Sequence, residues 1–141
     1  MAFRVVLAAE SRGSAEILAP LAGELMLRNM EVVMLGLGTA LERKGFGLRH
    51  VFSVTDKSEI SLSSWPTNCQ LLITGLTGRH SAEVALCRLA RARGIFCVGI
   101  LDNVDGLEVR LHPDASALPH IILICSSKDD GLHVGFALAT D

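Results

Sequence analysis

The chain has 141 residues, of which half are hydrophobic but only 4% aromatic, and its formal net charge is −2. This length fits a single domain over residues 1–141 with a core built from Leu, Val, Ile and Ala. The small charge, without a long run of Lys or Arg, argues against nucleic acid or a membrane surface as a partner. The first apolar run ends at Glu10, too early for a signal peptide or a membrane span, which favours a cytoplasmic protein.

The amino-terminal quarter predicts a strand, a helix and a second strand. Residues 3–9 are nearly all apolar, which is typical of a strand buried on both faces. From Ser14 to Leu25 apolar residues recur at helical spacing. Pro20 falls within that stretch, which indicates a helix that starts after Ser14 or bends at the proline. Residues 31–35 predict the second strand.

The middle of the chain gives weaker patterns. Residues 42–50 predict a short helix interrupted by glycines, and residues 50–54 a third strand. The stretch that follows is rich in Ser and Asp, which predicts a loop as far as Pro66.

Residues 71–102 carry the clearest pattern. The apolar run LLIT leads through the turn GLTGRHS into an amphipathic helix over residues 81–93, and a second apolar run occupies residues 95–101. This succession is typical of a βαβ unit. Arg88 and Arg91 are expected to lie on the solvated face of the helix. Residues 121–125 predict a last strand, and the tail after it is ambiguous.

Together these segments predict an α/β domain: one doubly wound, mostly parallel, Rossmann-like sheet of about five to six strands, with helices on both faces. Right-handed crossovers place the ligand crevice of such a sheet at the carboxyl ends of its strands. Three turns are expected there, over residues 10–14, 74–81 and 102–106.

Small hydroxylated residues and glycines in the first two turns lead into helix amino termini. Backbone N–H groups and the helix dipole favour phosphate or carboxylate at such positions. An alternative interpretation gives Ser14 and Ser81 only a capping role and the glycines only a role in turning the chain. The candidate ligand-binding residues are Ser11, Gly13, Ser14, Thr74, Gly75, Thr77, Gly78, Ser81 and Asp102.

Three residues at these turns are candidates for acid–base chemistry. Glu10 and Asp102 follow apolar strands, where a carboxylate can act as a general base or bind sugar hydroxyls. His80 precedes a helix in the second turn and is the histidine best placed for proton transfer. In the alternative interpretation the two carboxylates bond to backbone N–H groups and His80 is an exposed turn residue.

Common nucleotide, metal and hydrolase signatures are absent from the sequence. AESRGS stands after the first strand where a dinucleotide fingerprint requires GxGxxG, and there is no GxxxxGK[ST] or GxSxG motif. The five histidines show no HxH or HExxH spacing and the four cysteines no CxxC, so we expect neither a metal site nor a resident cofactor. Cys97 and Cys125 lie in apolar runs and are expected to be buried free thiols.

The string ITGLTGRHSAEVALCRLARARGIFCVGILDN, with PDASALPHIILI downstream, resembles the amino-terminal Rossmann-like domain of GT-B-like proteins. These are the superfamily of nucleotide-sugar glycosyltransferases and UDP-N-acetylglucosamine 2-epimerases. SRGSAEILAPLAGELMLRNMEVVMLGLG is similar to the first βαβ unit of such domains. The matching positions of the longer string include Thr74, Gly75, Thr77, Ser81, Glu83, Leu101 and Asp102.

GT-B enzymes place the donor nucleotide mainly in a second domain. The resemblance therefore implies an isolated half-domain that binds a sugar, a nucleotide sugar or a related anionic metabolite without complete catalytic machinery. Its partner would be a second copy in a homodimer, or a protein that carries the second domain.

LLITGLTGRHSAEVALCRLARARGIFCVGI also resembles the core of SIS sugar-phosphate isomerase-like domains. Of their S-x-S-G-x-T-x-E loop, Thr77 and Gly78 match, whereas His80 and Ala82 stand where Thr and Glu are usual. This resemblance implies sugar-phosphate binding, or isomerisation with Glu10, His80 or Asp102 as the base. A third interpretation is a noncatalytic oligomerisation module, because a small chain this hydrophobic can expose apolar surface. All three stay open.

Overall fold

The computed structural model describes residues 3–36, 69–79, 81–101, 110–111, 114–128 and 131–138. The elements predicted over residues 42–66, the turn over residues 102–106, His80 and Asp102 lie outside the described residues. In chain order the elements are β1 (Arg4–Ala9), α1 (Arg12–Leu27), β2 (Glu31–Gly36), β3 (Leu71–Gly75), α2 (Ala82–Ala92), β4 (Phe96–Leu101), the 3-10 turn η3 (Ala115–Ala117), β5 (Ile121–Lys128) and β6 (Gly131–Leu138).

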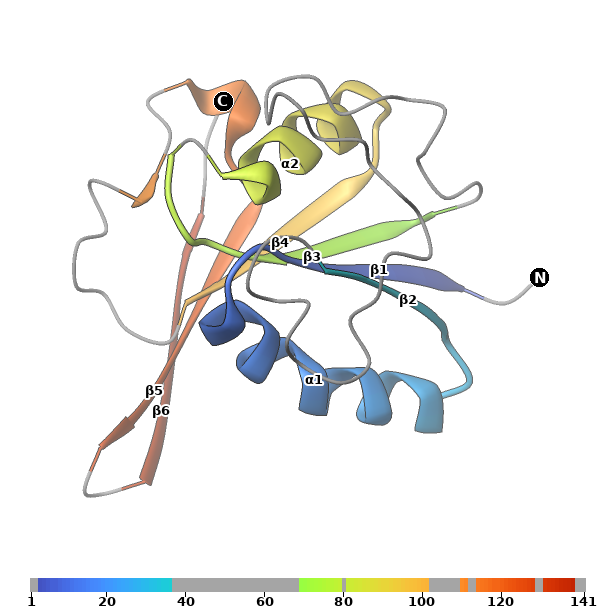
Figure 1. Cartoon of the computed structure of the whole chain (residues 1–141), viewed down its shortest axis with the longest axis vertical. Helices are drawn as coiled ribbons and strands as arrows, with labels where there is room; N and C mark the ends of the chain where they lie inside the picture. Colours follow the sequence, from blue (N-terminus) through green and yellow to red (C-terminus); the bar gives the residue numbers. More distant parts are fainter. Residues whose placement is uncertain are drawn as a thin grey trace.

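The strands form one six-stranded sheet in the order β2-β1-β3-β4-β5-β6. Strands β1 to β5 pair in parallel, and β6 pairs with β5 in antiparallel fashion. Helix α1 covers one face of the sheet and α2 the other (Figure 1). The predicted doubly wound, mostly parallel sheet with helices on both faces is confirmed. The ambiguous tail contributes β6.

The central strand β1 shows why the sequence favours this fold. Its residues Val5 to Ala9 are all fully buried. Alternate side chains point to opposite faces of a strand. Val6 and Ala8 accordingly pack in the core beneath α2, whereas Val5 and Leu7 pack against α1. An uninterrupted apolar run is what a strand between two helical layers requires.

Helix α1 starts before Ser14, earlier than in one of the two alternatives predicted from the sequence. The Ser11 side chain caps it by accepting the Ser14 N–H at 3.1 Å, and the helix begins at Arg12 and continues past Pro20. The prediction of a start after Ser14 is therefore wrong. Pro20 lies on the exposed side of the helix. The carbonyl that loses its N–H partner there, that of Glu16, belongs to an exposed residue and can be hydrated.

Helix α2 occupies nearly the predicted range, with Ser81 as its amino-terminal cap and Arg93 as its carboxyl-terminal cap. Cys69, Cys87 and Cys97 are free and lie in the core that α2 covers. A hydrogen bond with Cys87 and burial raise the pKa of the Cys97 thiol, and burial raises that of Cys69. The Cys97 and Cys69 thiols are therefore poor nucleophiles. The Cys125 side chain lies outside the described part of the chain.

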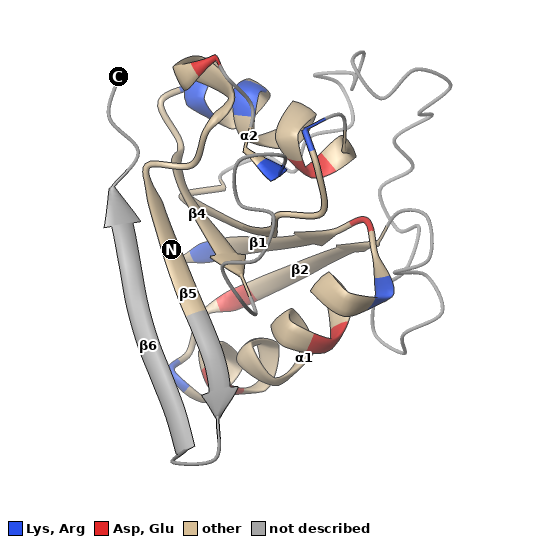
Figure 2. Cartoon of the chain, turned by 90° about the vertical axis from the view of Figure 1, so that its left-hand side faces the viewer, with Lys and Arg blue, Asp and Glu red and all other residues tan. Residues whose placement is uncertain are grey.

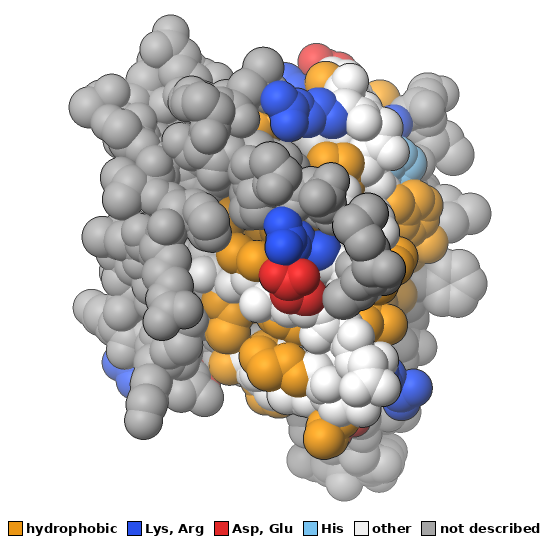
Figure 3. All heavy atoms as spheres, turned by 90° about the vertical axis from the view of Figure 1, so that its right-hand side faces the viewer, with side chains coloured by type: hydrophobic (Ala, Val, Ile, Leu, Met, Phe, Trp, Pro, Cys, Tyr) orange, Lys and Arg blue, Asp and Glu red, His pale blue; other side chains and the backbone are white. Residues whose placement is uncertain are grey.

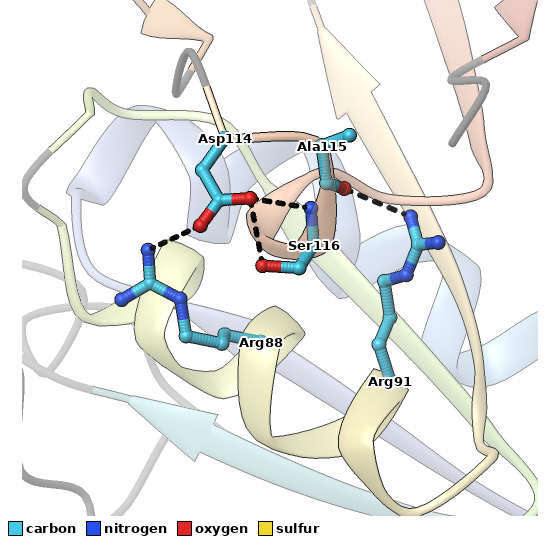
Figure 4. A network of polar contacts seen from close by, with 5 residues as sticks. All are labelled: Arg88, Arg91, Asp114, Ala115 and Ser116. Atoms are coloured by element: carbon cyan, nitrogen blue, oxygen red, sulfur yellow. Dashed lines mark hydrogen bonds and ion pairs between the residues drawn. The ribbon is translucent and has the colours of Figure 1, made fainter.

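The outer face of α2 holds the turn η3 in place (Figure 4). The Arg91 guanidinium donates to the carbonyl oxygens of Ala115 and Leu118 at 3.1 and 2.8 Å. The Arg88 guanidinium lies 3.8 Å from the Asp114 carboxylate. The predicted solvated face is therefore wrong for Arg91, which is half-buried and satisfies two carbonyl groups of a distant segment.

Exposed apolar side chains gather at the amino ends of the strands (Figure 3). An ion pair between Arg4 and Glu31, at 2.7 Å, lies at this end of β1 and β2. The His120 ring stacks on Phe96 with the ring centroids 4.7 Å apart, and its Nδ1 accepts the Cys97 N–H at 3.0 Å. Among the residues that the structure describes, the exposed large hydrophobic ones are Phe3, Met26, Leu27 and Phe96. None of the candidate ligand residues that the structure describes belongs to this apolar set.

None of the described helices is long and apolar enough to cross a membrane.

Candidate functional site

The site lies where the sheet changes its direction of winding. Strand β1 has β2 on one side and β3 on the other. Helices α1 and α2, which follow β1 and β3, leave toward opposite faces of the sheet (Figure 2). In open α/β sheets the crevice between two such diverging connections, at the carboxyl ends of the strands, is the usual ligand site. The β1–α1 and β3–α2 loops meet at this point.

Three hydroxyl groups from the two loops are in mutual contact. The Ser14 and Thr77 hydroxyl oxygens lie 3.2 Å apart, although 63 positions separate them in the sequence. Thr77 donates to the Ser11 hydroxyl oxygen at 3.1 Å, and Ser11 donates to that of Ser14 at 3.1 Å. The structure thus brings three predicted ligand residues together into one cluster, which we call the hydroxyl cluster.

A cavity of about 130 Å³ opens beside this cluster. Ligand pockets for whole small molecules usually measure about 300–1,000 Å³, so this cavity matches one end group of a ligand. We call it the switch-point pocket, and it is lined by Ser11, Gly13, Ser14, Ile17, Leu76, Thr77, Ile100, Leu101 and Arg110. One wall is therefore polar and another is apolar, and Arg110 is the arginine among these lining residues.

The Glu83 side chain joins the β1–α1 and β3–α2 loops by hydrogen bonds to both. It is fully buried, in the first turn of α2. One carboxyl oxygen accepts the Thr77 N–H at 2.8 Å and the other accepts the Glu10 N–H at 3.1 Å. Burial raises the pKa of this carboxyl, and hydrogen bonds from Thr77, Glu10 and Ser14 oppose that effect without cancelling it. Glu83 thereby fixes the spacing of the loops that line the pocket.

Gly75 allows the close approach of the two loops. A Cβ atom added at Gly75 would overlap the Ser14 side chain and would lie 2.8 Å from the Glu83 carboxyl. Only a glycine at the end of β3 lets Ser14 and Glu83 come this close. Gly75 is not among the pocket residues, and it makes room for the hydroxyl cluster.

The remaining predicted residues have different surroundings. Thr74 is buried within β3, between Ala8 and Gly99 of the neighbouring strands. Ser81 accepts the Val84 N–H at 3.3 Å, as the capping interpretation proposes, and is not among the pocket residues. The capping interpretation is wrong for Ser14, because Ser11 caps α1.

Four candidates predicted from the sequence remain. Gly78 has open space where a Cβ would stand, and it is not among the pocket residues. The Glu10 backbone N–H bonds to Glu83, so this residue contributes to the loop contact through its main chain. His80 and Asp102 belong to the part of the chain that the structure leaves undescribed.

Arg110, Glu83 and the apolar wall were not predicted as site residues. Arg110 lies in the stretch DNVDGLEVRLHPDASA, which has no periodicity from which its position could be inferred. Glu83 stands two residues after the α2 cap, and an acid at this position usually indicates only a favourable interaction with the helix dipole. Its place in the S-x-E pattern was the one available signal.

The described residues contain no group of three or more His, Cys, Asp or Glu side chains that can hold a metal ion. The sequence matches no protein-family model and no curated protein.

Proposed function

We propose that this chain binds the anionic end group of a small sugar derivative, such as a sugar phosphate or nucleotide sugar, in the switch-point pocket. The observation that carries the proposal is the convergence of Ser11, Ser14 and Thr77 on one cavity at the crevice of the sheet. Such crevices bind ligands in doubly wound sheets generally.

The charges around the pocket favour an anion. Helix α1 directs its amino terminus toward the pocket through Ser11, Gly13 and Ser14, and its first turn carries no acidic residue. The partial positive charge of a helix amino terminus stabilises phosphate and carboxylate groups. Arg110 adds a guanidinium group to the lining.

The size and the apolar wall favour a ligand that extends beyond the pocket. About 130 Å³ accommodates an end group such as a phosphoryl group, and the rest of the metabolite would lie outside. Leu76 and Ile100 supply an apolar surface against which the carbon skeleton of a sugar derivative can pack.

Thermal unfolding with and without ligand tests this proposal. The panel contains sulfate, inorganic phosphate, glucose 6-phosphate and UDP-N-acetylglucosamine. A ligand that binds only the folded chain at a hundred times its Kd stabilises it by about 2.7 kcal/mol. We expect at least one phosphorylated compound to raise the Tm of the wild type and to raise that of Thr77→Val much less.

Ser116→Ala is the matched control, because it removes an exposed hydroxyl from η3, which contributes no residue to the pocket. It should respond to ligands as the wild type does. No Tm shift with any compound, or equal shifts for Thr77→Val and the wild type, would contradict the proposed site.

A second candidate function is association through β6. This strand forms the end of the sheet and pairs with β5 alone among the described strands. Edge strands expose N–H and carbonyl groups that can pair with another chain. The hairpin also continues past the sheet, since β5 pairs with β4 only over Ile121 to Ile124 (Figure 1). Sedimentation equilibrium tests it: a dimer supports association, and a monomer at all concentrations contradicts it.

A further inference from the structure

A row of hydrogen bonds connects the switch-point pocket with a buried carboxyl group. Thr77 is exposed, Ser11 half-buried, Ser14 buried and Glu83 fully buried. The Thr77 hydroxyl donates to Ser11, and the Ser11 hydroxyl donates to Ser14. The side chains of Thr77 and Ser14 both hydrogen-bond the Glu83 carboxyl. The row thus runs from the surface into the core.

The number of hydroxyl protons limits what this row can do. Each hydroxyl group donates one hydrogen bond and can rotate to choose its acceptor. When the Glu83 carboxylate is ionised it can only accept, so the O–H groups of Ser14, Ser11 and Thr77 point toward the carboxylate or toward one another. In that arrangement no O–H of the cluster remains for an anion in the pocket.

A proton on Glu83 reverses the row. The carboxylic acid then donates its own O–H to Ser14, which can donate to Ser11 in place of Glu83. Thr77, the exposed end of the row, is freed to direct its O–H into the pocket that it lines. An anion needs such donors, whereas a second negative charge beneath the hydroxyls repels it.

We propose that Glu83 takes up a proton when an anion binds in the switch-point pocket, so that the anion and one proton bind together. This inference rests on the proposed function. It assigns Glu83 a positioning role, since the residue acts on the ligand through the hydroxyl cluster and is itself sealed from solvent. The pocket would then bind its anion more tightly in mildly acidic solution.

The surroundings of Glu83 are consistent with this linkage. Burial already makes its charged form unfavourable, and hydrogen bonds from Thr77, Glu10 and Ser14 only partly compensate. A bound anion would withdraw hydroxyl donors and add repulsion, so both effects raise the pKa of this carboxyl further. The charged side chains on the segments around it are Glu10, Arg12, Glu16, Arg79 and Arg110, and His80 follows Arg79 in the sequence.

Sulfate is the probe for the experiment, because it does not change charge between about pH 5 and pH 8. Titration calorimetry measures its Kd for the wild type, Glu83→Gln and Glu24→Gln. We expect the wild-type Kd to rise by up to about tenfold per pH unit where Glu83 loses its proton. Glu83→Gln carries a neutral side chain and should keep its Kd within about twofold over the whole range.

Glu24→Gln is the matched control, since it removes an exposed carboxylate from α1 outside the pocket. It should follow the wild type. Repeating the wild-type titration in buffers of different ionisation enthalpy counts the protons taken up, with up to about one expected per sulfate. This second measurement needs no variant, so it decides the question even where Glu83→Gln fails to fold.

Two results would overturn this inference alone: sulfate binding without proton uptake by the wild type, or an unchanged pH dependence in Glu83→Gln. The latter would assign the proton to another group, such as His80. Absence of saturable binding of sulfate and phosphate at every pH would overturn the proposed function as well.

Discussion

Helices α1 and α2 begin at the same end of the sheet but use their amino termini differently. Each follows a serine cap: Ser11 accepts the Ser14 N–H, and Ser81 accepts the Val84 N–H. The first turn of α2 contains Glu83, whereas the first turn of α1 contains no acid. The α2 terminus therefore carries a carboxyl group of its own, and the α1 terminus faces the pocket.

This difference separates a helix terminus that holds the two loops together from one that faces the pocket. On the α2 side, Glu83 ties the Thr77 and Glu10 backbones together. On the α1 side, Ser11, Gly13 and Ser14 line the pocket. We expect substitutions that break the Glu83 contacts to reduce stability first, and substitutions at the α1 terminus to affect anion binding at a smaller cost in stability.

The largest effect is expected from Glu83→Ala. It leaves two backbone N–H groups without their acceptor, at roughly 1–3 kcal/mol each, and opens a cavity in the core. We expect the free energy of unfolding in urea to fall by about 3 kcal/mol. Glu24→Ala, at an exposed position of α1, should change it by less than about 0.5 kcal/mol. Equal effects of the two substitutions would contradict the role of Glu83 in holding the two loops together.

Gly75→Ala tests the closeness of the two loops. The added methyl group overlaps Ser14 and crowds Glu83, and such overpacking costs about 1–3 kcal/mol. Gly23→Ala is the opposite control, because its Cβ meets nothing within 4 Å in the interior of α1 and should stabilise the chain by about 0.5–1 kcal/mol. Denaturant unfolding measures both. A Gly75→Ala protein as stable as the wild type would mean that the loops can separate without cost.

The pH dependence of stability gives a third effect. Burial raises the pKa of Glu83 in the folded chain above its ordinary value of 4.5. The protonated form is then favoured by folding, so this contribution is fully present below pH 4.5 and is lost as the pH rises through the folded-state pKa. Relative to Glu83→Gln, the wild type should lose about 1.4 kcal/mol per pH unit between the two pKa values.

Urea unfolding of both proteins between about pH 4 and pH 8 measures this difference. Taking the difference between the wild type and Glu83→Gln removes the contributions of other titrating groups. A wild type that gains stability relative to Glu83→Gln as the pH rises would reverse the sign of the argument and show a carboxylate favoured by its hydrogen bonds.

The sheet was predictable because its signals are local. The apolar run of β1 and the run, turn and helix that lead from β3 into α2 each indicate their element without knowledge of the rest of the chain. The start of α1 was less predictable, since Pro20 suggested a later helix, whereas its exposed position lets the helix continue. Local patterns do not reveal which side of a helix a proline will occupy.

The candidate site was predictable only in part. The rule for parallel sheets identified the turns containing Ser11 and Thr77, because the carboxyl ends of neighbouring strands meet at one edge. The role of Glu83 depends on contacts with Glu10, 73 positions away, and no local pattern encodes such a contact. The same holds for Arg110, which follows β4 within an aperiodic stretch.

The smallest effect is expected from removing each of the two serine caps in turn. Ser11→Ala and Ser81→Ala each remove a capping hydroxyl, and each should lower the free energy of unfolding by about 1 kcal/mol. Only Ser11 also lines the pocket and belongs to the hydroxyl cluster, so only Ser11→Ala should weaken sulfate binding in calorimetry at pH 6. A matched loss of stability with unequal loss of affinity would locate the anion at α1, whereas equal affinities would mean that the α1 terminus, like that of α2, serves only the fold.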